Sequence, residues 1–206
     1  MSEIYAEEII KNIRGQEEVK EEEDWYHIEN DITRGYVVVK YEKMELEEKT
    51  LLNGRLTMLL PVRFEEMDEE LMEIKYPDPD RPEWIYSNKT GDVSMTFFLD
   101  EGEILAEEVE SVRDIIIGEM KRLYPASAVK DKKTIGKGQN AVSLFSLDIP
   151  LMDETCYHLM FFRAMADGLL MGTFDCSVNE KKQWQKILPQ LLETMREEDR
   201  EINQEL

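Results

Sequence analysis

The sequence predicts an α+β domain, a three-layer α/β/α sandwich in which helices flank a mostly antiparallel central sheet. The first observation behind this prediction is the segment 155–176, whose alternation is typical of a β-hairpin with apolar residues on both faces. The second is a pair of segments, residues 103–124 and 177–195, whose apolar residues recur at helical spacing. A hairpin that is apolar on both faces needs a covering layer on each side, and the two helices supply those layers.

The sheet is predicted to begin well before this hairpin. Residues 36–41 (YVVVKY) are strand-like, and residues 56–61 form an apolar run that is opened by Asn53-Gly54. That dipeptide accepts the positive backbone angles of a tight hairpin turn. We therefore expect residues 43–49 to pair with residues 56–61.

A short helix and two further strands are predicted next. Apolar residues recur at helical spacing over residues 67–74, Asp68 is placed to cap that helix, and Tyr76-Pro77 prevents its continuation. Residues 84–86 are apolar and β-prone, and residues 93–99 alternate between apolar and polar side chains. The alternation predicts a strand with one buried face.

The longest predicted helix covers residues 103–124, between the capping pair of Asp100 and Glu103 and the terminator Pro125. Residues 127–135 and 140–149 are predicted strands around the loop TIGKGQN. The predicted apolar stripe of the helix consists of Leu105, Val109, Val112, Ile116, Met120 and Leu123.

The terminal helix is predicted to start at an S-x-x-E capping box formed by Ser177 and Glu180. Pro189 removes one hydrogen bond from its interior, so we expect a kink there. Its predicted apolar positions are Trp184, Ile187, Leu188, Leu191, Leu192 and Met195.

The hairpin register predicts that both cysteines are free. With the turn at Asp167-Gly168, Cys156 lies opposite Asn179, and Cys176 lies opposite Leu159. The resulting offset is roughly 10 Å along the strand, which is beyond the reach of a disulfide. Free thiols indicate a reducing compartment, and we expect a cytoplasmic protein.

The charge balance argues against two classes of partner. The 206 residues include 25 Lys and Arg against 46 Asp and Glu, a formal net charge of −21. Such a field repels phosphate backbones and anionic membrane surfaces, so we expect no nucleic-acid partner and no membrane partner. No stretch is apolar and long enough to span a bilayer, and residues 1–24 lack the pattern of a signal peptide.

The acidic residues also indicate the domain organisation. Residues 16–24 (QEEVKEEED) are nearly all charged and cannot bury enough apolar surface to fold. We expect an acidic N-terminal helix and linker over residues 1–34, a single α/β/α domain over residues 35–198 and a tail over residues 199–206.

No catalytic or metal-binding constellation is predicted, and we expect no cofactor. Cys156 and His158 share one face of a predicted strand and could form a nucleophile and base, but a local structural role for the histidine is the simpler interpretation. Asp78 and Asp80 could hold calcium weakly, but they lack the further spaced oxygens of a calcium loop.

The candidate binding residues are basic and aromatic. Lys130, Lys132, Lys133 and Lys137 form the one basic concentration of the chain. They either discourage pairing at a sheet edge or contact an acidic partner or the acidic N-terminal arm. Trp84 and Tyr86 are the candidate lining of a small-molecule pocket. Among 12 methionines, most are expected in the core, and the candidates for an adaptable surface are Met67, Met72 and Met152.

Four motifs carry a resemblance to a known family: GRLTMLLP (54–61), a short helix that ends in KYP (75–77), RPEWIYSN (81–88) and VSMTFFL (93–99). The chain resembles a set of uncharacterised bacterial proteins with the PsbP-like fold, an α/β/α sandwich shared by the photosystem II subunit PsbP, the Ran-binding protein Mog and several bacterial accessory proteins. The resemblance covers about residues 54–198. It implies a binding or assembly factor without catalysis; the acidic N-terminal extension and the missing export signal depart from the pattern.

These observations favour a non-enzymatic binding module, an adaptor or chaperone-like factor that holds a protein or peptide segment on a sheet face or in a groove. The alternative is a small-molecule binder or an unrecognised hydrolase with a pocket near Trp84, Tyr86 and the helix from Glu103. A third hypothesis is self-association through the N-terminal helix.

Overall fold

The structure is a computed structural model and describes residues 29–198. Within these residues eleven strands form two antiparallel sheets, accompanied by three α-helices and three short 3-10 turns. The four-stranded sheet has the order β1 (Tyr36–Val39), β2 (Glu42–Leu51), β3 (Leu56–Pro61) and β11 (Arg196–Glu197). The seven-stranded sheet has the order β4 (Glu65–Glu66), β5 (Trp84–Ser87), β6 (Ser94–Glu101), β10 (Gly168–Ser177), β9 (Thr155–Met165), β8 (Val142–Pro150) and β7 (Val129–Ile135). The helices are α2 (Glu69–Lys75), α3 (Val109–Leu123) and α4 (Lys181–Glu193).

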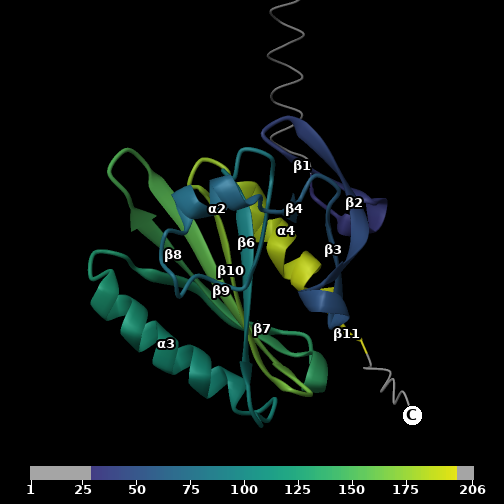
Figure 1. The fold of residues 1–206 in the computed structure, drawn as a ribbon, viewed down its shortest axis with the longest axis vertical. Coiled ribbons are helices and arrows are strands. Elements are labelled where there is room, and N and C mark those ends of the chain that lie inside the picture. The colour runs from purple at the N-terminus through teal and green to yellow at the C-terminus, as the bar shows by residue number, and fades with distance from the viewer. Residues whose placement is uncertain (1–28, 199–206) are drawn as a thin grey trace, which may run out of the picture.

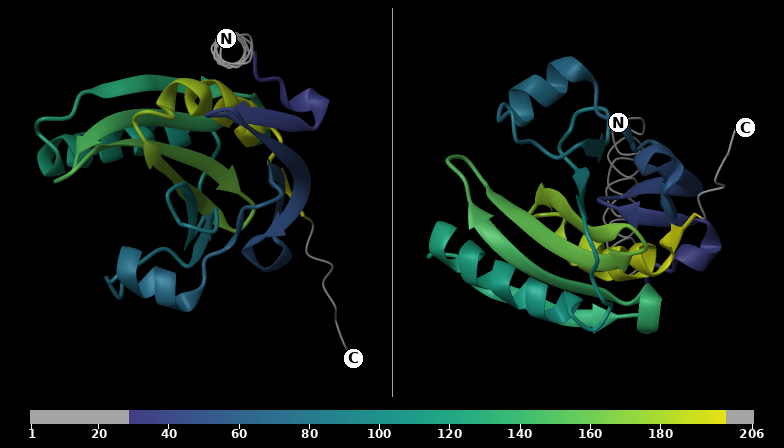
Figure 2. Two further views of the ribbon diagram at one scale, coloured as in Figure 1. Left: turned by 90° about the horizontal axis from the view of Figure 1, so that it is seen from above. Right: turned by 60° about the horizontal axis from the view of Figure 1, so that its bottom comes forward.

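Different elements cover the two faces of the seven-stranded sheet (Figures 1 and 2). α3 packs against β7, β8 and β9 on one face, where Val109 and Phe162 are buried together. α4 and the four-stranded sheet cover the other face, and Trp184 and Phe161 belong to the larger core between them. The predicted combination of helices with mostly antiparallel sheet is confirmed. None of the helices within residues 29–198 combines the length and the apolarity that a membrane crossing requires.

The predicted pairing of residues 43–49 with residues 56–61 is confirmed, since β2 and β3 form a hairpin with Leu51 opposite Leu56. Asn53 and Gly54 have positive φ angles of 55° and 86°, as the turn prediction requires. The sequence did not predict that this hairpin belongs to a separate sheet. That sheet is completed by β11, which pairs with β3 from the far end of the chain.

The hairpin of β9 and β10 has the predicted faces but a different register. Gly168 lies opposite Met165, and Cys176 lies opposite Tyr157, so the register is displaced by two residues from the prediction. Because side chains alternate with a period of two, a displacement by two leaves every side chain on its predicted face. Cys156, opposite Ser177, lies on the other face from Cys176, and both cysteines are free.

The predicted start of the first long helix is wrong. α3 begins at Val109, because β6 continues through Glu101 by pairing with the start of β10, and Asp100 is therefore a strand residue. The outer positions of the predicted stripe are also wrong: Leu105 and Leu123 are 59% and 69% exposed. The buried residues of the helix are Val109, Arg113, Ile117 and Met120.

The terminal helix has the predicted apolar face but not the predicted cap. Ser177 is the last residue of β10, and the Glu180 side chain makes no capping hydrogen bond. Its carboxylate instead accepts a hydrogen bond from Trp184 Nε1 at 3.2 Å and pairs with Lys40 Nζ at 2.8 Å. The helix runs through Pro189. Its buried residues are Trp184, Ile187, Leu188, Leu191 and Leu192, followed by Met195 beyond its end.

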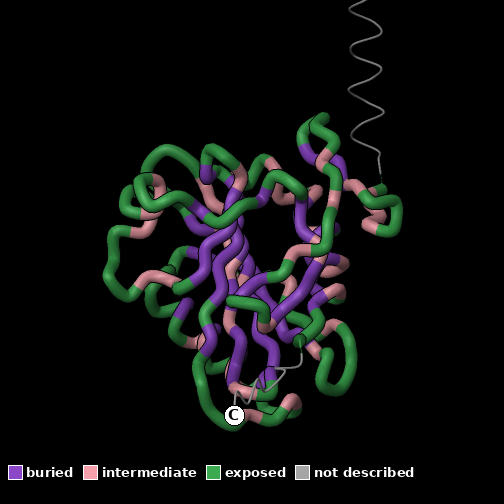
Figure 3. The backbone as a smooth tube through the Cα atoms, turned by 45° about the vertical axis from the view of Figure 1, so that its right-hand side comes forward, coloured by how far each residue is buried: buried purple, intermediate pink, exposed green. Residues whose placement is uncertain are grey.

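β1 and β7 are edge strands of the two sheets, and the free edge of each is protected. The Asn30 side chain accepts a hydrogen bond from Val38 N at 2.7 Å and donates one to Val38 O at 2.9 Å, so it occupies the free edge of β1. Asn30 is itself held to α4, because Gln190 Nε2 donates to its carbonyl oxygen at 2.9 Å. On the other sheet, β7 is an edge strand with a register shift between Lys130 and Lys133. Figure 3 shows that burial is concentrated in the strands and that the connecting loops are mostly exposed.

Candidate functional site

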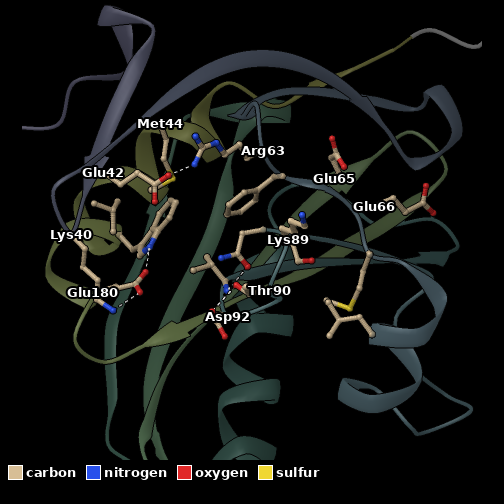
Figure 4. A pocket seen from close by; sticks show the side chains of 18 of the residues that line it. Lys40, Glu42, Met44, Arg63, Glu65, Glu66, Lys89, Thr90, Asp92 and Glu180 are labelled. Atoms are coloured by element: carbon tan, nitrogen blue, oxygen red, sulfur yellow. Dashed lines mark hydrogen bonds and ion pairs between the residues drawn. The ribbon is translucent and has the colours of Figure 1, made fainter.

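A cavity of about 700 Å³ is lined by elements of both sheets. Its lining comes from four separate segments: residues 39–44 at the β1–β2 turn, residues 63–71 around β4 and the start of α2, residues 87–93 at the β5–β6 turn, and residues 180–184 at the start of α4. Figure 4 shows Lys40, Glu42, Arg63 and Glu180 grouped on one side of the cavity and Glu65 and Glu66 on another. We call this cavity the inter-sheet groove.

Local backbone chemistry shapes the turns around the inter-sheet groove. Lys40 and Tyr41 have positive φ angles of 46° and 65°, as a two-residue hairpin turn requires. The Asp68 carboxylate caps α2 by accepting a hydrogen bond from Leu71 N at 2.9 Å, as predicted. The Asn88 side chain accepts a hydrogen bond from Val93 N at 3.2 Å and closes the β5–β6 turn. Each lining segment is therefore held by its own hydrogen bonds.

The inner part of the inter-sheet groove is apolar. Trp184 and Phe64 are almost completely buried, and their ring centroids are 6.0 Å apart. Phe174 packs on the other side of Trp184 with a centroid distance of 4.8 Å. Met67 and Val93 are also buried in the lining. An apolar group that enters the groove would meet a preformed apolar surface.

The rim of the inter-sheet groove is acidic. Its lining contains six carboxylates and three cationic side chains, an excess of three negative charges. Lys40 pairs with Glu180, and the same hydrogen bond raises the pKa of Lys40. Arg63 pairs with Glu42 (Figure 4). Glu65 and Glu66 of β4 are exposed and form no ion pair with a residue of the described range.

The titratable groups of the inter-sheet groove are carboxylates and basic side chains. The lining holds no histidine or cysteine that could act as a nucleophile or a base at neutral pH. Within residues 29–198, no group of three or more His, Cys, Asp or Glu side chains is placed to hold a metal ion. The groove offers an apolar interior, charged groups at its mouth and a net negative potential.

The four candidate lysines lie far from the inter-sheet groove, at the opposite edge of the seven-stranded sheet. They belong to the edge strand β7 and to the turn that follows it. Lys130 Nζ pairs with Asp148 at 2.6 Å, and Lys132 Nζ pairs with Asp114 at 2.9 Å. Lys133 and Lys137 are exposed. None of the four lines the inter-sheet groove.

Trp84 and Tyr86, the candidate lining of a small-molecule pocket, are core residues. They are 6% and 9% exposed and belong to the larger core, where Tyr86 packs edge-to-face on Phe97 at a centroid distance of 5.9 Å. Burial raises the pKa of Tyr86. Neither side chain lines the inter-sheet groove.

Cys156 and His158 share one face of β9, as predicted, and both contact Asp175 rather than each other. The thiol donates a hydrogen bond to Asp175 Oδ1 at 3.5 Å, and His158 Nδ1 lies 2.6 Å from the same oxygen. Burial, together with the negative charge of Asp175, raises the pKa of Cys156 to about 12. The sulfur is therefore a neutral thiol at neutral pH, and its geometry agrees with the structural interpretation of the pair.

This raised pKa leads to a measurable expectation for thiol reactivity. Because its pKa is raised, the thiolate fraction of Cys156 at pH 8 should be roughly a thousandfold lower in the folded protein than in the denatured chain. Only the thiolate is nucleophilic, so the reactivity of the sulfur should fall by the same factor. Iodoacetamide should therefore modify Cys156 very slowly in the folded protein, with a rate that rises about tenfold for each added pH unit. Time-resolved mass spectrometry measures this rate, and the denatured chain is the control. Modification of both forms at equal rates would contradict the expectation.

The three methionines proposed for an adaptable surface have different environments. Met67 is buried in the lining of the inter-sheet groove, Met72 is partly buried on α2, and Met152 is fully exposed in the β8–β9 turn. Sequence reasoning missed Phe64, Glu65 and Glu66 as site residues. The only sequence signal for them was the run RFEEMDEE (63–70), in which a lone aromatic residue precedes a series of carboxylates.

Comparison with known proteins defines the fold. No protein-family model matches the sequence, and no curated protein matches it. Among solved structures, the chain is similar to the solution structure of cyanobacterial PsbP (CyanoP) from Synechocystis sp. PCC 6803, with a TM-score of 0.53. The fold is PsbP-like. The sequence identity of 9%, over 74% of this chain and 92% of that chain, limits the likeness to the PsbP-like fold.

Proposed function

We propose that this protein is a non-enzymatic binding module, a cytoplasmic adaptor or chaperone-like factor that holds a segment of another protein in the inter-sheet groove. The observation that carries the proposal is the contrast between the apolar interior of the groove and its acidic mouth. The cavity volume lies within the range of specific ligand sites.

The chemistry of the mouth defines the class of partner. An apolar side chain of the partner would occupy the interior beside Phe64 and Trp184, and flanking lysine or arginine side chains would meet Glu65 and Glu66. Opposite charges across the mouth would favour encounter and orientation. In this proposal α3 and α4 are the outer layers of an α/β/α sandwich, and the groove lies between its sheet and the additional four-stranded sheet.

The proposal is tested by reversing charges at the mouth. Peptides are selected from a random displayed library on the full-length chain, and their affinities are measured by fluorescence anisotropy. We expect the selected peptides to carry an apolar residue flanked by lysine or arginine. The double variant Glu65→Lys/Glu66→Lys should weaken their binding about tenfold or more, because like charges would then face each other.

A matched control separates this local effect from the change in net charge. Glu103 and Glu107 are exposed residues before α3 and do not line the groove, so Glu103→Lys/Glu107→Lys changes the net charge by the same amount. The control should leave peptide affinity nearly unchanged. Equal weakening by both double variants, or a selection that enriches no sequence pattern, would refute the proposal.

A further inference from the structure

A second cavity, of about 510 Å³, lies on the α3 side of the seven-stranded sheet, beyond the C-terminal end of that helix. β6, β9 and β10 form its base, and Tyr76 and Tyr124 contribute to its walls. Leu151 adds an apolar wall from the β8–β9 turn. Its volume is in the range of small-molecule sites. We call this cavity the sheet-end pocket.

A connected polar network forms the base of the sheet-end pocket, and Asp175 is its centre. His158 Nδ1 lies 2.6 Å from Asp175 Oδ1, and Thr173 Oγ1 donates to Asp175 Oδ2 at 3.2 Å. Thr96 and Thr173 share a hydrogen bond of 2.8 Å. Cys156 is the third donor to the carboxylate. The Asp175 side chain is 27% exposed and lines the pocket, so a ligand can reach its carboxylate.

The network also orients the histidine. Nδ1 of His158 faces the Asp175 oxygen, and this contact fixes the orientation of the ring. Nε2 makes no hydrogen bond to any other residue between 29 and 198. The base of the pocket therefore presents the Asp175 carboxylate, beside the His158 ring, to a ligand that brings hydrogen-bond donors.

The electrostatics of the pocket favour a positive ligand. Its lining contains Asp92, Glu154 and Asp175 against a single cation, Lys75. The negative charge of Asp175 contributes to raising the pKa values of both Cys156 and Tyr76, after the larger effect of burial. Tyrosine rings at the wall add surfaces on which a cation or an aromatic group can pack.

We propose that the sheet-end pocket binds a small organic cation, a protonated amine attached to an aromatic or aliphatic body. The ammonium group donates a hydrogen bond to Asp175 beside the His158 ring, and the apolar body lies between Tyr124 and Leu151. The two linings share Asp92, but Glu65 and Glu66 line only the inter-sheet groove, whereas His158 and Asp175 line only the sheet-end pocket. The proposal therefore stands or falls independently of the proposed function.

The test uses three probes of nearly equal size that differ in charge: benzylamine, benzyl alcohol and benzoate. Each is titrated into the isotopically labelled full-length protein, and binding is followed by nuclear magnetic resonance shifts of the β9 and β10 amides. We expect benzylamine to bind about tenfold or more tightly than either other probe, with shifts centred on His158 and Asp175. This ratio corresponds to one charge-assisted hydrogen bond.

Two variants and a control identify the residues responsible. Asp175→Asn should weaken benzylamine binding about tenfold or more, whereas Asp100→Asn, an exposed position at the far end of β6, should not change it. If thermal melting shows that Asp175→Asn is unfolded, Tyr124→Ala replaces it, because this partly exposed wall residue can be removed without opening the core. That variant should weaken binding several-fold. Equal affinities for benzylamine and benzoate, unchanged binding by a folded Asp175→Asn or by Tyr124→Ala, or no shift at millimolar benzylamine would overturn the proposal.

Discussion

Replacing Trp184 with alanine is expected to lower the free energy of unfolding by about 3–5 kcal/mol, the cost typical of removing a large buried aromatic side chain. Trp184 is fully buried and lies between Phe64 and Phe174, with ring centroids 6.0 and 4.8 Å away. Its loss would leave a cavity where α4, the four-stranded sheet and β10 meet. Since small domains have only about 5–15 kcal/mol of stability in total, much of the population should unfold under mild denaturant.

Urea titration followed by near-ultraviolet circular dichroism measures this loss. Trp184→Phe is the informative control, because it keeps an aromatic ring against Phe64 and Phe174 but loses the hydrogen bond from Nε1 to Glu180. Trp184→Phe should lower the free energy of unfolding by about 1–2 kcal/mol, which corresponds to the loss of one hydrogen bond with modest repacking. An alanine variant with an unchanged urea midpoint would show that Trp184 does not hold α4 on the core.

The second large effect is expected at Gly172, where an added methyl group has no space. Gly172 lies opposite Phe161 on β9 and Phe97 on β6. A Cβ atom at this position would lie 2.1 Å from Cζ of Phe161, whose ring is buried and packs edge-to-face against Phe97 at 5.7 Å. Because neither ring can move away, Gly172→Ala should destabilise the protein by about 3 kcal/mol.

Gly118 provides a matched control for this substitution. It lies in the interior of α3, and an added Cβ there meets no atom within 4 Å. Gly118→Ala should therefore stabilise the protein by about 0.5–1 kcal/mol, since alanine favours the helix. Adding Phe161→Leu to Gly172→Ala should recover part of the loss by making space. If both glycine variants melt at the same temperature, the close contact between Gly172 and Phe161 is wrong.

The parts of the fold that the sequence predicted correctly depend on local periodicity. The fully buried face of the hairpin β9–β10 follows from alternation alone, and it is unaffected by the two-residue difference in register. The buried face of α4 follows in the same way from spacing around Trp184 and Leu191. Periodic patterns over ten or more residues outweigh local irregularities.

The incorrect predictions depend on contacts between residues that are distant in sequence. The start of α3 was predicted too early because Asp100 resembles a capping residue, whereas pairing with β10 holds it in a strand. The second sheet gains its fourth strand from β11, which pairs with β3 from about 140 residues away. Propensity and capping signals carry no information about such pairing.

The candidate site was even less accessible to sequence reasoning. The inter-sheet groove is assembled from four segments between residues 39 and 184, none of which carries a recognisable binding motif. Lys130 and Lys132 attracted attention because they are concentrated in sequence, yet each is paired with a carboxylate at the edge of the sheet. Trp84 and Tyr86 are aromatic residues of the kind that is common on binding surfaces, but they lie in the core. A cluster of charged or aromatic residues in the sequence identifies a binding surface only when the tertiary neighbours of those residues are known.

The hydrogen bonds of Asn30 to Val38 determine where the folded unit has to begin. A chain that starts at Gly35, the boundary suggested by composition, would lose the side chain that occupies the outer edge of β1 and the link from Asn30 to Gln190. The bared edge could then pair with the same edge of a second copy. A dimer formed by such a shortened chain would be an artefact of the cut, and any comparison of oligomeric state should retain residues 29–34.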